Sequence, residues 1–305
     1  MLILIARRTA MLVCALVFAT TSPSSAAPRD TLVIGSISRN IKEEIETFQP
    51  LIEYLNPRLG AVGIRQVKIA IVTNPKEMSR RLQNGDIDIY IDSPFIVADI
   101  GRKTGATPFL RRWKKGMAEY RSLFVARADS GINSLEDLRG RVIAFDEPFS
   151  TSGYLLPKAM LIQLGYRVVE VSDAQTEVPP DVIGYVFSMD DVNTMFWIDR
   201  GKAAAGVTSP DFFEKFEQKH KNKYVVFERS INIPRQVVAH RANLAPPIIA
   251  ELERVLIGME NDEDGRTALQ QFQKTTRFDR FPTGAQATFA PIHALLDVLS
   301  EEPTN

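Results

Sequence analysis

The residues with the clearest chemical potential are three hydroxyl side chains and a glycine in a row, Ser150-Thr151-Ser152-Gly153. They lie between a strand-like apolar run at 141–147 and a helix-like run that follows. One hydroxyl suffices to cap a helix. Three hydroxyls, with a glycine that lets a ligand approach the backbone, present several donors to one point at the positive end of a helix dipole. The run therefore fits either a helix cap or an anion-binding loop.

Pro157 limits where the regular helix begins. Proline has no N–H to donate and, inside a helix, clashes with the carbonyl group four residues earlier, which here belongs to Gly153. We therefore expect the helix to begin nearer Gly153 than Ser150, with the hydroxyls in the preceding turn. Both interpretations of the hydroxyl run accommodate that start.

The usual signatures of catalysis are absent from the sequence. It contains no G-x-G, no G-x-x-x-x-G-K, no H-E-x-x-H and no G-x-S-x-G, which argues against dinucleotide sites, P-loops, zinc proteases and serine hydrolases. The three histidines, His220, His240 and His293, are far apart in the chain. We therefore expect neither an enzyme nor a bound metal or cofactor.

The first 26 residues predict an export signal peptide. Arg7 and Arg8 precede an apolar stretch at 10–19, and small residues run up to Ala26. Cys14, the single cysteine, falls within this segment, so the mature chain has no disulfide or thiolate site. No later segment approaches the roughly 20 apolar residues that a membrane span needs. We expect a soluble mature protein in the periplasm.

The balanced charge of the chain argues against nucleic acid as a partner. The 37 basic and 37 acidic residues balance, which disfavours nucleic acid as a partner. Hydrogen bonds to a charged group contribute roughly 1.5 to 3 kcal/mol each. Four or five of them offset ligand desolvation and leave the about 8 kcal/mol of a micromolar complex. An anion site without basic side chains can therefore reach micromolar affinity.

Strand-like and helix-like runs alternate along the chain, which is the pattern of an α/β protein with largely parallel sheets. No internal repeat or long linker interrupts the pattern, so a body of two lobes is the simpler interpretation. The runs expected as strands are 31–38, 67–73, 86–93, 121–130, 141–147, 166–172, 203–209 and 224–230, and those expected as helices are 41–59, the run from Asn74-Pro75, a short capped helix at 134–139, 190–201, 210–220 and most of 246–300.

The stretch around the hydroxyl run, INSLEDLRGRVIAFDEPFSTSGYLLPKAML at 132–161, resembles the PhnD-like family of phosphate-, phosphite- and phosphonate-binding periplasmic proteins. Its S-T-S-G-Y-L-L-P segment is the most specific part of the match. Further similarity extends the resemblance over about residues 31 to 295, at LVIGSIS (32–38), FQPLIEYLNPRLG (48–60), LQNGDIDIYIDSP (82–94) and INIPRQVVAHRANL (231–244).

The resemblance implies a type II periplasmic-binding-protein fold, with two α/β lobes, a ligand cleft and closure by hinge motion. Lobe 1 would comprise 27–122 and 236–305, lobe 2 would comprise 123–235, and the crossings would fall near 120–129 and 230–237. In this family the S-T-S-G run binds three phosphoryl oxygens. Carried over, the hydroxyls of Ser150, Thr151 and Ser152 donate to the ligand, and the N–H groups of Ser152 and Gly153 assist.

Departures from the family pattern indicate a rebuilt pocket beside the loop. Members that bind aminoethylphosphonate have aromatic side chains where this chain has Pro75 and Asp92. Phe149 occupies a position that is usually small or polar. The family histidine before the next helix corresponds to Asp190 or Asp191, and the two acidic residues that hold the substrate ammonium correspond to Asp211 and Gln236. The anion is therefore expected to be small or to carry a different substituent.

Some of these candidates also have a structural interpretation. Asp92 after a strand, and Asp190 or Asp191 at a helix start, fit a turn or a cap as well as a ligand contact. A carboxylate in the pocket would accept the proton of a singly protonated phosphate or phosphonate, and it would repel sulfate, which has no such proton. Tyr90 alternates with Ile89 and Ile91, so it fits core packing as well as ligand contact.

Together these observations predict a monomeric periplasmic receptor that binds a phosphonate, phosphite or phosphate and delivers it to the permease of an ABC importer. Two alternatives remain open. The same fold serves as a ligand sensor that docks a membrane histidine kinase, and it also hosts enzymes. The sequence offers no matched acid, base and nucleophile for the enzyme alternative.

Overall fold

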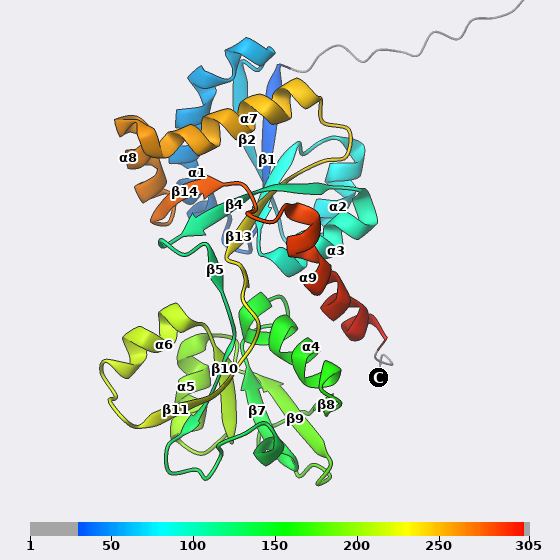
Figure 1. Ribbon diagram of the computed structural model, residues 1–305, viewed down its shortest axis with the longest axis vertical. Helices are drawn as coiled ribbons and strands as arrows, with labels where there is room; N and C mark the ends of the chain where they lie inside the picture. The colour runs from blue at the N-terminus through cyan, green and yellow to red at the C-terminus, as the bar shows by residue number, and fades with distance from the viewer. Residues whose placement is uncertain (1–29, 302–305) are drawn as a thin grey trace, which may run out of the picture.

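The computed structural model of the protein describes residues 30–301. The predicted signal peptide, residues 1–26, lies outside the described residues. Within residues 30–301, no helix combines the length and apolar character that crossing a membrane requires. Two lobes stand one above the other, each built on its own sheet (Figure 1).

The first lobe is a six-stranded sheet in the order β14-β4-β13-β3-β1-β2. Its strands are β1 (Thr31–Ile37), β2 (Gln66–Val72), β3 (Ile89–Asp92), β4 (Thr107–Lys114), β13 (Gln236–His240) and β14 (Thr275–Asp279). The helices that cover it are α1 (Ile41–Leu55), α2 (Pro75–Asn84), α3 (Pro94–Thr104), α7 (Pro246–Gly258), α8 (Glu263–Gln271) and α9 (Ala285–Ser300). β1 pairs in parallel with β2 and β3, whereas β13, β4 and β14 add antiparallel ladders.

The second lobe repeats this architecture with the order β11-β6-β10-β7-β9-β8. Its strands are β6 (Leu123–Arg127), β7 (Arg141–Phe145), β8 (Arg167–Glu170), β9 (Val182–Phe187), β10 (Ala205–Thr208) and β11 (Tyr224–Arg229), and its helices are α4 (Leu156–Gln163), α5 (Asp191–Asp199) and α6 (Pro210–Glu217). β7 to β10 are parallel neighbours. Side chains and loops at the carboxyl ends of such strands form the ligand sites of open α/β sheets.

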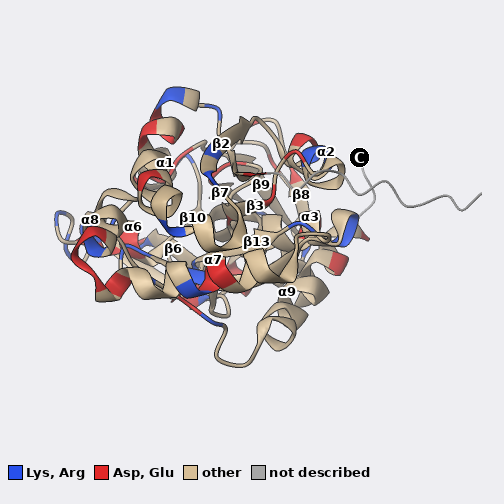
Figure 2. Ribbon diagram, turned by 90° about the horizontal axis from the view of Figure 1, so that it is seen from above, with Lys and Arg blue, Asp and Glu red and all other residues tan. Residues whose placement is uncertain are grey.

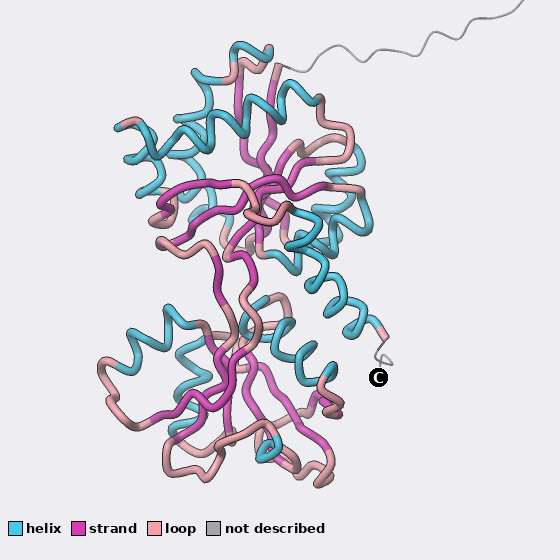
Figure 3. Tube along the Cα trace, viewed as in Figure 1, coloured by secondary structure: helices cyan, strands magenta, loops and turns pink. Residues whose placement is uncertain are grey.

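Two extended segments connect the lobes and run side by side (Figure 3). β5 (Glu119–Tyr120) and β12 (Ile233–Pro234) pair antiparallel. Just beyond them, Ser122 N–H donates to Ser230 Oγ at 2.8 Å and Ser230 N–H donates to the Ser122 carbonyl at 3.1 Å. These crossings fall within or at the edge of the expected ranges, 120–129 and 230–237, and the type II periplasmic-binding-protein fold is confirmed.

Helix α9 also bridges the lobes. It extends from the first lobe along α4 of the second (Figure 1). Phe289 and Ile292 of α9 share one buried apolar cluster with Leu156 and Ala159 of α4. Removing this apolar surface from water holds α4, and the turn that precedes it, against the first lobe.

Several elements differ from the sequence expectation. Helix α3 and strands β4, β9, β13 and β14 were not predicted. The expected helix at 134–139 is only a 3-10 turn, Glu136–Leu138, because Asp137 accepts the N–H groups of Asn133 and Ser134 and closes a tight turn instead. The first helix ends at Leu55 and 3-10 turns follow it, which shortens the expected 41–59.

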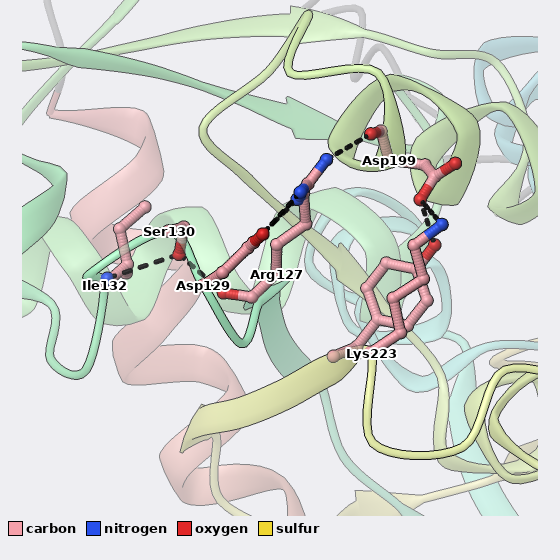
Figure 4. Close-up of polar contacts among 7 residues, drawn as sticks. Arg127, Asp129, Ser130, Ile132, Asp199 and Lys223 are labelled. Atoms are coloured by element: carbon pink, nitrogen blue, oxygen red, sulfur yellow. Dashed lines mark hydrogen bonds and ion pairs between the residues drawn. The ribbon is translucent and has the colours of Figure 1, made fainter.

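Ion pairs between basic and acidic side chains lie on the outer surface of the protein. At the end of β6, Arg127 donates to the Asp129 carboxylate and to the Asp199 carbonyl, and Lys223 pairs with the Asp199 carboxylate (Figure 4). The outer helices α2 and α8 likewise carry both signs of charge (Figure 2). The balanced total charge of the chain therefore reflects a mixed surface.

Candidate anion-binding site

The hydroxyl run follows β7 and forms one wide helical turn before α4. Thr151–Leu155 is a π turn, and the regular helix begins only at Leu156. Pro157 explains the late start, since it has no N–H and is tolerated only in the first turn. Ser150 is the cap, because its Oγ accepts the Gly153 N–H at 3.1 Å. The cap interpretation therefore holds for Ser150, and the Gly153 N–H is already engaged.

Thr151 and Ser152 are not used in this cap. Thr151 is 3% exposed, and its buried Oγ1 meets no partner at good hydrogen-bonding geometry among the described residues, although it lies close enough to the Tyr120 hydroxyl to affect the pKa of that group. Ser152 is half-buried. Next to both hydroxyls lies the buried side chain of Tyr120 on the first crossing; burial raises the pKa of Tyr120, and the charge of Arg235 and the two hydroxyls oppose that rise. The loop thus offers donors at the junction of the lobes.

Gly153 is required by close packing. A Cβ atom there would lie 2.4 Å from Cβ of Asp146 and 2.8 Å from Oγ of Ser150. Burial raises the pKa of Asp146 to about 6, against the opposing effect of the Ser150 hydroxyl and with a further contribution from Asp191. A carboxyl group that titrates in this range stands directly behind the loop, and the sequence analysis did not identify it.

A cavity of about 310 Å³ opens between the lobes beside the loop. Its lining comes from the carboxyl ends of strands in both lobes: Ile37, Ser38, Arg39, Thr73, Pro75, Asp92 and Ile96 from the first, and Glu147 and Phe149 from the second. Phe149 is 48% exposed. Three positions at which the sequence departs from the family pattern, Pro75, Asp92 and Phe149, are therefore brought together.

Asp92 and Tyr90 are neighbours on β3 with different surroundings. Burial raises the pKa of Asp92 to about 6, although the Ser93 N–H donates to its Oδ1 at 2.6 Å. Tyr90 is fully buried in the apolar core, and its hydroxyl group donates to the Val97 carbonyl at 3.3 Å. The structure thus places Asp92 at the cavity and Tyr90 in the core.

Asp190 and Asp191 both serve the start of α5. The exposed Asp190 is its cap, because Oδ1 accepts the Asn193 N–H at 2.6 Å. Asp191 Oδ1 accepts from Thr208 Oγ1 at 2.5 Å, and burial raises its pKa. Asp190 therefore acts as a helix cap. A ligand-binding role for Asp190 or Asp191 stays a prediction.

Asp211 and Gln236 are each held by a basic residue of the first lobe. Lys115 Nζ lies 2.9 Å from Asp211 Oδ2. Burial raises the pKa of Asp211, but this hydrogen bond and the charge of Arg235 outweigh it, and the pKa is lowered. Gln236 Oε1 accepts from Arg112 Nη1 at 2.5 Å. Asp211 Oδ1 has no hydrogen-bond partner among the described residues, but Gln236 is neutral, so the two positions do not supply the two carboxylates that hold a ligand ammonium.

The structure also shows a cluster of basic residues, which the balanced total charge of the chain does not indicate. Arg112 and Lys114 of β4 and Arg235 of the second crossing, which we call the basic cluster, lie near one another, and their charges influence one another. The Arg235 guanidinium lies 4.4 Å from the ring centroid of Tyr120, the residue beside Thr151 and Ser152. The sequence analysis did not identify these residues. The run RRWKK at 111–115 was the available signal.

No group of three or more His, Cys, Asp or Glu residues suited to a metal ion occurs within residues 30–301. The described part of the site therefore consists of hydroxyl groups, backbone N–H groups, carboxyl groups and the basic cluster.

Comparison with known proteins identifies the family. Residues 34–282 match the family described as ABC transporter, phosphonate, periplasmic substrate-binding protein. The chain belongs to this family. It is 28% identical over 141 residues to the phosphate-import protein PhnD of Mycolicibacterium smegmatis, a match that covers 45% of the chain and 43% of that relative. The chain thus matches less than half of the length of this curated relative.

Solved structures extend the likeness over nearly the whole chain. XAC2383 from Xanthomonas citri, bound to ATP, superposes with a TM-score of 0.82 at 26% identity over 90% of this chain and 100% of that one. PhnD1 from Prochlorococcus marinus, in complex with methylphosphonate, gives 0.63 at 18% identity over 90% and 99%. At 18% identity, the likeness to PhnD1 concerns the fold alone.

Proposed function

We propose that this protein is a periplasmic receptor that binds a phosphate-like oxyanion between its lobes and delivers it to an ABC importer. The lobes are proposed to divide at 122/123 and 235/236, as the sequence analysis expected, and to close on the ligand. Membership of the substrate-binding family supports the receptor role and the periplasmic location.

The observation that carries the proposal is the buried hydroxyl of Thr151, which meets no partner at good hydrogen-bonding geometry in the described part of the chain, although the Tyr120 hydroxyl lies close to it. Leaving a buried polar group unsatisfied costs roughly 1 to 3 kcal/mol. The group sits in a turn that starts a helix, beside Ser152 and opposite the basic cluster. A phosphoryl oxygen at this point would accept from Thr151 and Ser152 and lie near Arg235. One phosphoryl group therefore gives the Thr151 hydroxyl an acceptor.

The rest of the pocket supports a ligand without an ammonium group. The two positions that hold the ammonium in aminoethylphosphonate binders are Asp211, paired with Lys115, and the neutral Gln236. XAC2383, the relative at 26% identity, is described as bound to ATP, which is consistent with a phosphoryl ligand that carries a large organic group. The cavity beside Phe149 has room for such a group.

Calorimetric titration with phosphate, phosphite, methylphosphonate, ATP and sulfate tests this function. We expect at least one phosphoryl ligand to bind, and sulfate to bind more weakly because Asp146 and Asp92 favour a ligand that carries a proton. Thr151→Ala and Ser152→Ala should each weaken phosphoryl binding about tenfold to a hundredfold. Ser172→Ala, in an exposed loop of the second lobe, should leave it unchanged.

Two results would contradict the proposal. One is the failure of every phosphoryl compound to bind the folded protein. The other is a phosphoryl affinity that neither Thr151→Ala nor Ser152→Ala alters.

A further inference from the structure

The basic cluster has no acidic partner within reach. Arg112 is 1% exposed, and its guanidinium donates only to neutral oxygens, those of Thr275, Gln236, Phe272 and Gln273. Within residues 30–301, no carboxylate lies within ion-pair distance of Arg112, Lys114 or Arg235, and the ammonium of Lys114 makes no hydrogen bond. Arg112 is buried, and Lys114 and Arg235 are half-buried. Charges withdrawn from water without an acidic partner are costly.

Neighbouring basic residues on the same segment are compensated. Arg111 pairs with Asp279 at 2.6 Å and with Glu119 at 3.1 Å, and Lys115 pairs with Asp211 at 2.9 Å. Arg112 and Lys114 are two residues apart on β4, so they point to the same face of the sheet. The absence of carboxylates is, among the described residues, specific to this face.

One acid moderates the cluster without neutralising it. The half-buried Glu44 affects both Arg112 and Lys114, but its Oε1 accepts the Ser36 hydroxyl at 2.5 Å instead of binding either cation. Burial first, and then the charges of Arg112 and Arg235, lower the pKa of Lys114 to about 7. Uncompensated positive charge therefore remains beside Tyr120, where the Arg235 guanidinium lies 4.4 Å from the ring centroid.

We propose that Lys114 and Arg235, the half-buried members of the basic cluster, bind a second anionic group of the ligand, so that the ligand carries two linked phosphoryl groups. This inference rests on the proposed function, in which the hydroxyl turn of the second lobe holds the first phosphoryl group. The two sets of donors come from different lobes and meet at Tyr120, which touches the hydroxyls on one side and Arg235 on the other. A diphosphate spans both sets, whereas a single phosphoryl group satisfies the hydroxyl turn and leaves Lys114 unpaired.

Calorimetry with pyrophosphate and phosphate, at one ionic strength and without divalent metal, tests the inference. Pyrophosphate is expected to bind at least tenfold more tightly than phosphate. Lys114→Met should weaken pyrophosphate binding about tenfold and phosphate binding less than about threefold. Ser152→Ala should weaken both. Lys103→Met removes the same charge from an exposed ion pair on α3 and should alter neither.

The outcomes separate the inference from the function on which it rests. If Lys114→Met weakens phosphate and pyrophosphate equally, or if pyrophosphate gains nothing over phosphate, one phosphoryl group contacts both lobes and the inference is wrong while the receptor function stands. If neither anion binds and Ser152→Ala has no effect on any phosphoryl ligand, the proposed function is wrong and the inference falls with it.

Discussion

Lys115 of the first lobe and Asp211 of the second form an ion pair across the cleft, with Nζ and Oδ2 2.9 Å apart. Lys115 lies in the turn after β4, and Asp211 lies in the first turn of α6. Their side chains are 41% and 13% exposed, so the pair is partly shielded from water. It is a direct contact between the two lobes.

A double-mutant cycle separates this bridge from direct ligand contact. If Asp211 acts through Lys115, then Lys115→Met and Asp211→Asn should each lower phosphate affinity about twofold to fivefold, and the double variant should be no worse than either. The four affinities are measured by calorimetry. Effects that simply add would show instead that Asp211 contacts the ligand independently of Lys115.

Asp92 should destabilise the ligand-free protein at neutral pH. Its pKa rises from about 3.8 in the unfolded chain to about 6 in the fold, so the folded state binds more protons between these values and stability falls as pH rises from 3.8 to 6. Asp92→Asn should therefore raise the free energy of unfolding at pH 8 by on the order of 1 to 3 kcal/mol, with a smaller gain at pH 4.5.

Urea unfolding at the two pH values measures this difference. Asp181→Asn, which alters a carboxylate that is 63% exposed, serves as the control and should shift stability by less than about 0.5 kcal/mol. A loss of stability in Asp92→Asn at pH 8 would mean that the charged carboxylate stabilises the fold.

Pyrophosphate binding should take up a proton through Lys114. The pKa of Lys114 is lowered to about 7 in the free protein, and a nearby anion raises it again because it favours the ammonium form. Above pH 7 the affinity should therefore fall as pH rises. The other charged groups that act on Lys114 are Arg112, Lys115, Arg235, Glu44 and Asp92.

Calorimetry at pH 7.5 in two buffers of different protonation enthalpy gives the proton count. The wild type should take up more protons than Lys114→Met, by up to one per pyrophosphate bound. Comparing the two proteins cancels the ionisation of pyrophosphate itself. Equal proton uptake by both would place the titrating group elsewhere.

Gly153 should not tolerate a side chain. A methyl group there meets Asp146 Cβ at 2.4 Å, closer than two carbon atoms approach without displacement. Gly153→Ala should therefore shift the hydroxyl turn and lower phosphate affinity at least tenfold, with a loss of about 1 to 3 kcal/mol in stability. Both are measured, by calorimetry and by thermal unfolding.

Gly258 provides the matched control. It is the last residue of α7, at φ −68°, and a methyl group on its Cα would meet no atom within 4 Å. Gly258→Ala should therefore keep phosphate affinity and gain about 0.5 to 1 kcal/mol in stability. A Gly153→Ala protein that binds phosphate like the wild type would show that the turn adapts freely.

The sequence predicted the α/β alternation and the place of the hydroxyl turn because both depend on local patterns. It did not reveal β4, whose letters TPFLRRWK alternate poorly and read as a charged segment. Arg112 is buried there because neutral oxygens from β13, β14 and the preceding loop satisfy its guanidinium. Those partners lie more than a hundred residues away, beyond the reach of periodicity.

The candidate site was likewise predicted only at positions that the motif or the family resemblance identifies in the sequence. The run at 150–153 and the rebuilt positions Pro75, Asp92 and Phe149 were identified, and the structure gathers them around one turn and one cavity. The helix start at Leu156 is later than expected because one π turn intervenes. Asp146 and the basic cluster depend on burial and on tertiary proximity, which the letters do not encode.

The crystal structure of the protein saturated with inorganic phosphate tests the central claim most directly. The account predicts one phosphate between the lobes, with oxygens about 2.6 to 3.0 Å from Thr151 Oγ1 and Ser152 Oγ. A phosphate bound elsewhere, with the Thr151 hydroxyl still unpartnered, would contradict it.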